Sequence, residues 1–136
     1  MSCELCATTG ETLLWGGRRC RVILIADADL PGFCRVIWND HVKEMTDLPV
    51  QMREELMQTV FAVESAVREV MQPEKINLAS LGNITPHLHW HVVPRFTNDK
   101  YFPNSIWSEP VRHASVATAN DIRARLSASI LKNITA

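Results

Sequence analysis

Residues 87–95, HLHWHVVPR, constrain the fold of this chain more than any other stretch. The 136-residue chain has five histidines, and three of them, His87, His89 and His91, alternate here with apolar residues. A period of two is typical of a β-strand that has one face in a core and the other face outside it. We therefore expect a strand whose three imidazoles share one face, while the apolar residues between them face the core.

The apolar pattern elsewhere predicts four more short strands. Residues 11–27 contain two of them around a turn at Gly16-Gly17, and residues 34–39 contain a third. Residues 75–83 predict the fourth, which ends at a Gly-Asn pair. Together with the histidine strand, these segments predict an antiparallel sheet of about five strands.

Two further segments have a helical period. Between Thr46 and Pro73 the apolar residues recur at steps of three and four, which predicts one long amphipathic helix. Asp47 is a candidate cap for it, and Pro49 suits its first turn. Residues 119–134 predict a C-terminal helix, and residues 96–113 predict a long irregular loop. The fold class is therefore α+β, with the long helix packed on the sheet.

Length and charge limit the classes of partner. Residues 1–136 fit a single domain, and 46% hydrophobic residues suffice for a core. The formal net charge is -1, and no run of basic residues exceeds Arg18-Arg19, so we expect neither nucleic acid nor membrane as a partner. The chain has no G-x-G-x-x-G motif or P-loop, which argues against the commoner nucleotide folds. It also shows no secretory signal, so we expect a cytoplasmic protein.

The row of histidines has three interpretations. A chance alignment of structural histidines is one, although such residues usually occur singly. A metal site that uses all three is another, but His87 and His91 would lie about 13 Å apart along a strand that rises ~3.3 Å per residue, whereas zinc takes nitrogen ligands at ~2.0–2.1 Å. The strand geometry favours the third interpretation, in which the imidazoles have different functions.

Such a row suits phosphoryl chemistry. A neutral imidazole attacks phosphorus with its lone pair without first losing a proton, and a neighbouring imidazole can donate a hydrogen bond to the phosphoryl oxygens. The attacking nitrogen keeps its lone pair only if an acceptor, such as a backbone carbonyl, holds the proton on the other ring nitrogen. His89, in the middle of the row, is the best candidate nucleophile.

The seven residues from His87 to Val93 match the pattern His-φ-His-φ-His-φ-φ, where φ is apolar. The chain thus resembles the histidine triad family, and Pro94-Arg95 resembles the branch of fragile histidine triad proteins and diadenosine tetraphosphate hydrolases. DADLPGFCRVI and INLASLGN are similar to family segments as well, so that the resemblance covers residues 20–95.

The resemblance implies a nucleotide hydrolase that cleaves at the α-phosphate of dinucleoside polyphosphates or nucleoside phosphoramidates. His89 would form a nucleotidyl-histidine intermediate, His91 would bind the phosphate oxygens, and His87 would brace the site or bind zinc. The alternatives are a nucleotidyltransferase and a nucleotide-binding or interaction protein with little turnover. The resemblance also implies a homodimer and no organic cofactor.

Three polar residues outside the triad are candidates for substrate contacts. By resemblance, Asn83 would lie near the scissile oxygen and Asp27 would hold the ribose hydroxyls, while Asn77 is a weaker candidate for substrate binding. The alternative for both Asn83 and Asp27 is an ordinary turn residue. The chain departs from many relatives at Phe33, where they have histidine, so any role of that fourth histidine is absent. The stretch between Asn77 and His87 is also shorter than in many relatives, and this difference affects the pocket for the leaving group. Trp107 could line a base or a protein interface.

Residues 1–10 contain the pair Cys3 and Cys6, whose spacing is that of a metal knuckle. One such pair needs two further ligands. By resemblance to zinc-bearing members of the family, these would be His41 and His87, so that the predicted cofactor is a structural zinc ion. The alternative is a flexible terminus without metal.

Overall fold

The computed structural model of the protein describes residues 3–135. It contains a five-stranded antiparallel sheet with the strand order β1-β2-β3-β5-β4, and two α-helices. The predicted α+β class, the number of strands and both helices are therefore confirmed. The elements are β1 (Thr12–Gly16), β2 (Cys20–Leu24), β3 (Cys34–Trp38), α1 (Val50–Met71), β4 (Lys75–Ala79), β5 (His89–Arg95) and α2 (Ile122–Thr135).

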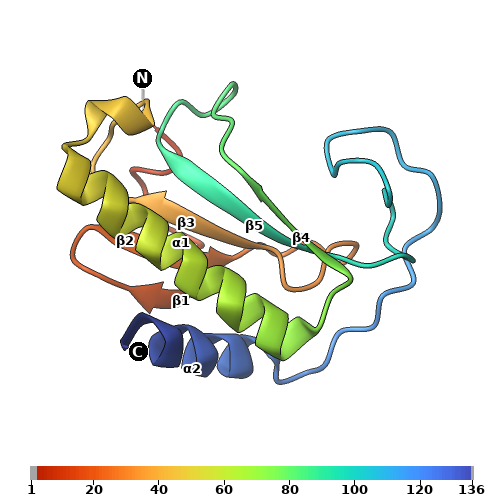
Figure 1. The fold of residues 1–136 in the computed structure, drawn as a ribbon. Helices are drawn as coiled ribbons and strands as arrows, with labels where there is room; N and C mark the ends of the chain where they lie inside the picture. The colour runs from red at the N-terminus through yellow and green to blue at the C-terminus, as the bar shows by residue number, and fades with distance from the viewer. Residues whose placement is uncertain (1–2, 136) are drawn as a thin grey trace.

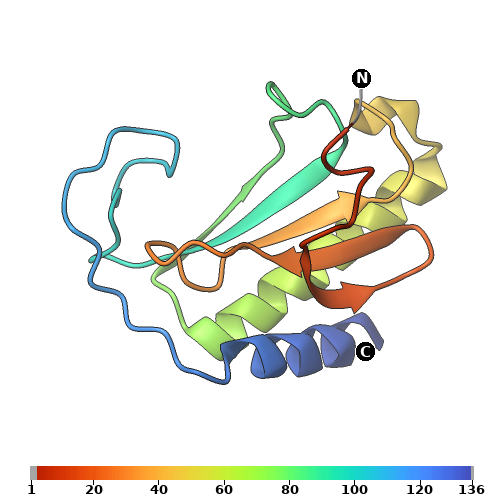
Figure 2. The same cartoon turned by 180° about the vertical axis from the view of Figure 1, so that it is seen from behind.

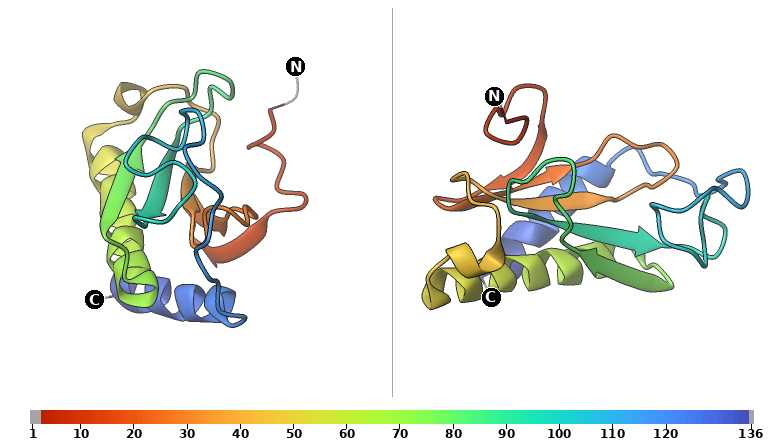
Figure 3. Two further views of the ribbon diagram at one scale, coloured as in Figure 1. Left: turned by 90° about the vertical axis from the view of Figure 1, so that its right-hand side faces the viewer. Right: turned by 90° about the horizontal axis from the view of Figure 1, so that it is seen from above.

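Both helices cover the same face of the sheet. Figure 1 shows α1 lying across the sheet and α2 beside it near β1, and the view from above in Figure 3 places both helices on one side. Strand residues Val22, Val36 and Val92 are fully buried there against Val60 and Val63 of α1. This layer is the main core, and its burial is the main favourable contribution to the stability of the fold. Within residues 3–135, neither helix is long and apolar enough to span a bilayer.

The start of α1 differs from the prediction. Asp47 belongs to a preceding 3-10 turn (Met45–Asp47), where its carboxylate accepts a hydrogen bond from the backbone N–H of Glu44. The N-cap of α1 is Pro49, which lacks a side-chain hydrogen bond. At the other end α1 stops at Gln72, a left-handed residue with φ 49°, directly before a proline.

The histidine strand also begins later than expected. β5 starts at His89, because His87 lies in a bend where its N–H donates to the carbonyl of Thr85 at 2.8 Å. Ile37 of β3 pairs with His89, and Arg35 pairs with His91. His89 and His91 therefore share one face of the sheet as predicted, while His87 leaves the pleat and takes its own direction.

The second face of the sheet, opposite the helices, is covered by segments without regular structure. Figure 2, the view from behind, shows the N-terminal segment crossing this face at one end of the strands. Leu5 of that segment is buried against Ile23 and Ile37. At the other end of the face, Phe33 and Val93 form a small cluster beside the 96–113 loop. His89 and His91 lie between these two covered regions.

Candidate active site and metal site

His89 has its ring fixed by the backbone. Its Nδ1 lies 2.6 Å from the carbonyl oxygen of His87, so Nδ1–H donates and Nε2 carries the lone pair. The carbonyl of His89 in turn accepts a hydrogen bond from the hydroxyl of Ser80 at 2.7 Å. The side chain is 6% exposed. The ring is thus rigidly held and presents an unprotonated nitrogen on the side away from the backbone.

The ring of His91 is packed among three other aromatic rings. Its ring is 4.9 Å from that of His89, 5.7 Å from Phe33 and 5.1 Å from Trp107, between ring centroids. Burial, aided by the charges of His89 and Arg35, lowers the pKa of His91 to about 4. Burial likewise lowers the pKa of His89. Both imidazoles are therefore neutral at pH 7, as nucleophilic attack and hydrogen-bond donation by a neutral ring require.

His87 belongs to a second cluster, together with Cys3, Cys6 and His41. One nitrogen or sulfur atom from each of the four side chains lies within 4.8 Å of all the others. His87 donates Nε2–H to the carbonyl of Trp38 at 2.6 Å, which turns its Nδ1 toward the cluster. The Cys3 and Cys6 thiols come together because residues 3–7 form a turn in which the carbonyl of Cys3 accepts the N–H of Cys6.

The donor set fits a tetrahedral zinc ion. Bond lengths of ~2.1 Å to nitrogen and ~2.3 Å to sulfur place neighbouring ligand atoms about 3.3 to 3.8 Å apart. The Nδ1 atoms of His41 and His87 are 3.2 Å apart, and Sγ of Cys6 lies 3.4 and 3.5 Å from these two atoms. Sγ of Cys3 lies 3.4 Å from Nδ1 of His87. Cysteine and histidine are the ligands that structural zinc prefers, so the cluster is compatible with this ion.

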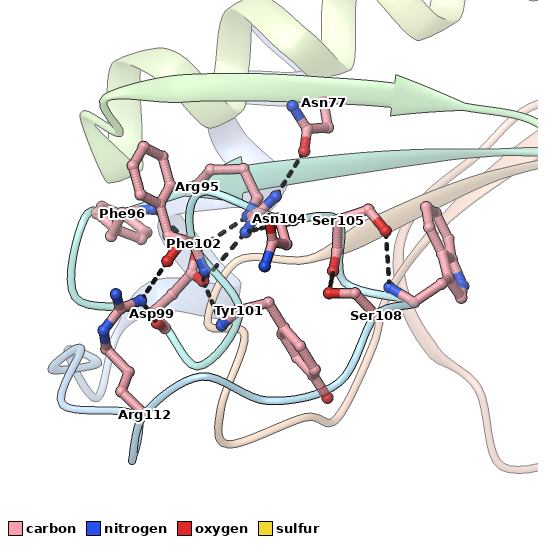
Figure 4. A network of polar contacts seen from close by, with 11 residues as sticks. Asn77, Arg95, Phe96, Asp99, Tyr101, Phe102, Asn104, Ser105, Ser108 and Arg112 are labelled. Carbon is pink, nitrogen blue, oxygen red and sulfur yellow. Dashed lines mark hydrogen bonds and ion pairs between the residues drawn. The ribbon is translucent and has the colours of Figure 1, made fainter.

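The 96–113 loop is ordered around one buried carboxylate. Asp99 is 1% exposed and accepts hydrogen bonds from Arg95 and from the backbone N–H groups of Phe96, Tyr101 and Phe102. Figure 4 shows this network, with Arg112 donating to the backbone on its outer side. The order of the loop places Trp107, which is half exposed, against the ring of His91.

The three remaining candidates are less closely tied to the triad. Asn83 is exposed in the connection between β4 and β5, and no side-chain hydrogen bond joins it to another described residue. Asp27 accepts the N–H of Asp29 at 2.9 Å, which is the turn role given above as the alternative. The amide oxygen of Asn77 accepts a hydrogen bond from Arg95 at 2.8 Å, at the base of the loop (Figure 4).

Sequence reasoning missed two residues at this site. Arg35 lies on the face of His91, and Ser80 holds the backbone of His89. The signal for Arg35 was a single cation in the otherwise apolar strand CRVIW. No comparable signal marks Ser80, because its hydrogen bond depends on how β4 leads into β5.

The three alternating histidines lie at the start of β5, with His89 and His91 on one face of a five-stranded antiparallel sheet. This arrangement is that of a histidine triad protein. The family model described as HIT domain matches residues 11–98, which is more than half of the chain. The chain therefore belongs to the HIT domain family, in which nucleotide hydrolases and transferases are common.

Several solved structures share this fold. A histidine triad protein from Bradyrhizobium japonicum is 25% identical, with a TM-score of 0.74 over 91% of this chain and 90% of that chain. A zinc-bound histidine triad family protein from Mycobacterium smegmatis is 22% identical, with a TM-score of 0.71 over 97% and 95%. A hypothetical histidine triad nucleotide-binding protein from Sulfolobus tokodaii is 16% identical, with a TM-score of 0.68 over 98% and 92%. A comparison with curated proteins finds no match.

Proposed function

We propose that the protein is a nucleotide hydrolase that acts through a nucleotidyl-histidine intermediate on His89. The observation that carries this proposal is the 2.6 Å hydrogen bond from Nδ1 of His89 to the carbonyl of His87. It leaves the lone pair on Nε2, and no hydrogen bond within residues 3–135 engages that atom. Fixing the ring in one orientation lowers the entropic part of the barrier to attack.

The reaction has two steps. In the first, Nε2 of His89 forms a bond to the α-phosphorus, and the bond from phosphorus to the leaving group breaks. A polyphosphate leaves as an anion, whereas an amine leaves after it takes up a proton from water. In the second step water attacks the phosphorus, the N–P bond breaks, and the nucleoside monophosphate is released while the proton of the water passes to solvent. Neutral His91 donates to the phosphate oxygens in both steps.

The substrate in this proposal is a dinucleoside polyphosphate of the diadenosine tetraphosphate type, or a nucleoside phosphoramidate. Membership of the fragile histidine triad branch is part of the proposal, and Pro94-Arg95 supports it at the level of sequence. Asp27 and Asn83 are proposed substrate contacts, since both lie in connections between strands that border the triad face. Asn77 stays the weaker proposed contact, because its amide oxygen already accepts a hydrogen bond from Arg95.

We also propose that a structural zinc ion is held by Cys3, Cys6, His41 and His87. The distances between the donor atoms support it, and so does the zinc-bound relative from Mycobacterium smegmatis. When bound, the ion would tie the N-terminal segment to His87. The carbonyl of His87 would then hold His89 more rigidly.

A homodimer is a further part of the proposal. Family resemblance is the main reason for it, and β4 leaves one edge of the sheet open. Leu81 and Ile84, just beyond that strand, are 52% and 96% exposed. A partner chain would cover such apolar surface. A mass of one 15.4 kDa chain in light scattering at micromolar concentration would contradict the dimer.

The catalytic proposal is tested with His89→Asn, and His113→Asn serves as the matched control because His113 is an exposed histidine outside the triad. Wild-type protein should convert diadenosine tetraphosphate or adenosine phosphoramidate to AMP, as measured by chromatography. His89→Asn should lose activity by several powers of ten while it still binds AMP. The control should retain wild-type activity.

Rapid quenching followed by mass spectrometry separates the alternatives. An AMP adduct on His89 that is released only by an added acceptor would identify a transferase. Binding without any adduct or turnover would identify a binding protein. Normal hydrolysis by His89→Asn, or an adduct on another residue, would contradict the mechanism.

A further inference from the structure

Arg35 lies on the triad face of the sheet, directly beside His91. It is on β3, where it pairs in register with His91 of β5 on one side and with Ile23 of β2 on the other. The side chain is half buried, and its Nε atom is fully buried. A cation thus lies next to the two neutral imidazoles of the candidate active site.

Two other arginines on this face show how the protein normally holds such a group. Arg21 is 6% exposed and binds both carboxylate oxygens of Glu11 at 2.8 Å. Arg95 is 2% exposed and binds Asp99 through Nε at 2.9 Å and through Nη2 at 3.2 Å. Each of these guanidinium groups is paired with a carboxylate in the two-pronged geometry that suits arginine.

Arg35 has no such partner. No carboxylate lies within ion-pair distance of it in residues 3–135, and Glu4, which contributes a favourable charge, is exposed. Only two buried side-chain nitrogen or oxygen atoms in the described part of the chain lack a hydrogen bond, Nε of Arg35 and Nδ1 of His91. Burying a cation without a counter-charge is unfavourable. Both unpaired atoms belong to one cross-strand pair. The accessible part of the half-buried Arg35 side chain is where an anion could supply the missing counter-charge.

Space for a ligand adjoins Arg35. A cavity of about 250 Å³ lies between the N-terminal segment and β2, and Arg35 lines it together with Glu4 and Ile25. Arg35 therefore borders this cavity and also pairs in register with His91. An anion in this cavity could contact Arg35 and would then lie near His91.

We propose that Arg35 is the anion-binding residue of this site and holds non-bridging oxygens of the substrate's phosphate chain beside His91. The identification of the anion as a nucleotide phosphate rests on the proposed function. A single unpaired cation among neutral imidazoles favours ligands of higher negative charge. Arg35 thereby selects polyphosphate substrates over nucleoside phosphoramidates, which carry less charge.

Calorimetric binding of adenosine, AMP and pyrophosphate to wild type, Arg35→Met and Arg35→Lys tests this. Wild type should bind AMP more tightly than adenosine, and it should bind pyrophosphate. Arg35→Met keeps the length of the side chain but removes its charge, so it should lose about 10- to 100-fold in affinity for AMP and pyrophosphate with adenosine unchanged. Arg35→Lys should fall between the two because it keeps the charge without the planar fork. Arg18→Met, which removes an exposed cation, is the control for net charge.

A purely structural role would give a different pattern. Removing an unpaired buried charge should leave the melting temperature of ligand-free Arg35→Met equal to or above that of wild type, whereas loss of a structural arginine would lower it. Equal affinity of wild type and Arg35→Met for AMP and pyrophosphate, or no preference of wild type for AMP over adenosine, would overturn the proposal. Arg35-dependent binding of pyrophosphate without any hydrolysis would leave this inference standing and reject the proposed function instead.

Discussion

His91 is held in its neutral form by burial, and this has a consequence for stability. In the unfolded chain its pKa is near 6.5, whereas in the folded protein the pKa is about 4. Between these values the unfolded chain binds a proton that the folded protein does not bind. The free energy of unfolding should therefore fall as the pH falls from about 6.5 to 4, and this contribution should be fully present above pH 6.5.

We expect the neutral ring to contribute on the order of 1 to 3 kcal/mol to this pH dependence. Urea unfolding of wild type and His91→Asn at pH 7 and pH 4.5 measures it. The loss of stability at the lower pH should be smaller in His91→Asn. His87 and His89 are present in both proteins, so the difference between the two losses of unfolding free energy is due to His91. Identical losses in the two proteins would show that His91 is not the responsible group.

At the scale of elements, the conformation of the 96–113 loop depends mainly on the hydrogen bonds that Asp99 accepts. Burial raises the pKa of Asp99, but hydrogen bonds from Arg95 and from three backbone N–H groups outweigh burial and lower it. Asp99→Asn keeps the shape of the side chain, yet it leaves Arg95 as an unpaired buried cation and turns an amide N–H toward other donors. Breaking a buried ion pair on one side costs about 3 to 5 kcal/mol.

The predicted result for Asp99→Asn is a lower free energy of unfolding and faster proteolysis within the loop. Because the loop carries Trp107 to His91, hydrolytic activity should fall as well. Asp29→Asn is the matched control, since Asp29 pairs with Lys100 of the same loop at 3.1 Å in a partly exposed contact. That variant should change stability by less than about 1 kcal/mol. Equal effects of the two substitutions would contradict a central role for Asp99.

At the scale of the whole molecule, the four-residue metal cluster joins three distant parts of the chain. Cys3 and His87 are separated by 84 residues, and Cys6 and His41 by 35. Protein purified without chelator should contain about one zinc ion per chain by elemental analysis. His41→Ala should lose the metal, and its melting temperature should fall by roughly 5 to 10 °C, as expected for a loss of about 2 kcal/mol.

His113→Ala is the control for that experiment, because it removes an exposed histidine outside the cluster. It should keep both the zinc content and the melting temperature of wild type. His41→Ala should also lose part of the hydrolytic activity, since His87 both faces the cluster and accepts the hydrogen bond of His89. Wild-type protein that is free of zinc, or His41→Ala that retains it, would contradict the proposed site.

The amino-acid sequence by itself determined the elements of this protein. The alternation at residues 87–95 and the helical period after Thr46 reflect local backbone geometry, so both could be read from neighbouring residues. The same alternation placed His89 and His91 on one face, and the match to the triad pattern singled out His89. Prediction failed at element ends. Asp47 binds the backbone of Glu44 in a separate 3-10 turn before the helix, and His87 leaves the strand and binds the carbonyl of Trp38 in another segment.

Only the tertiary structure decided which side chains meet across segments. The register of β3 against β5 sets Arg35 opposite His91, and a shift of one residue would have turned Arg35 to the other face. The path of the 96–113 loop around Asp99 brings Trp107 to His91. These contacts depend on packing between residues far apart in the chain, which local periodicity does not encode. For that reason the sequence indicated the proposed nucleophile, while the fold revealed the unpaired cation beside His91.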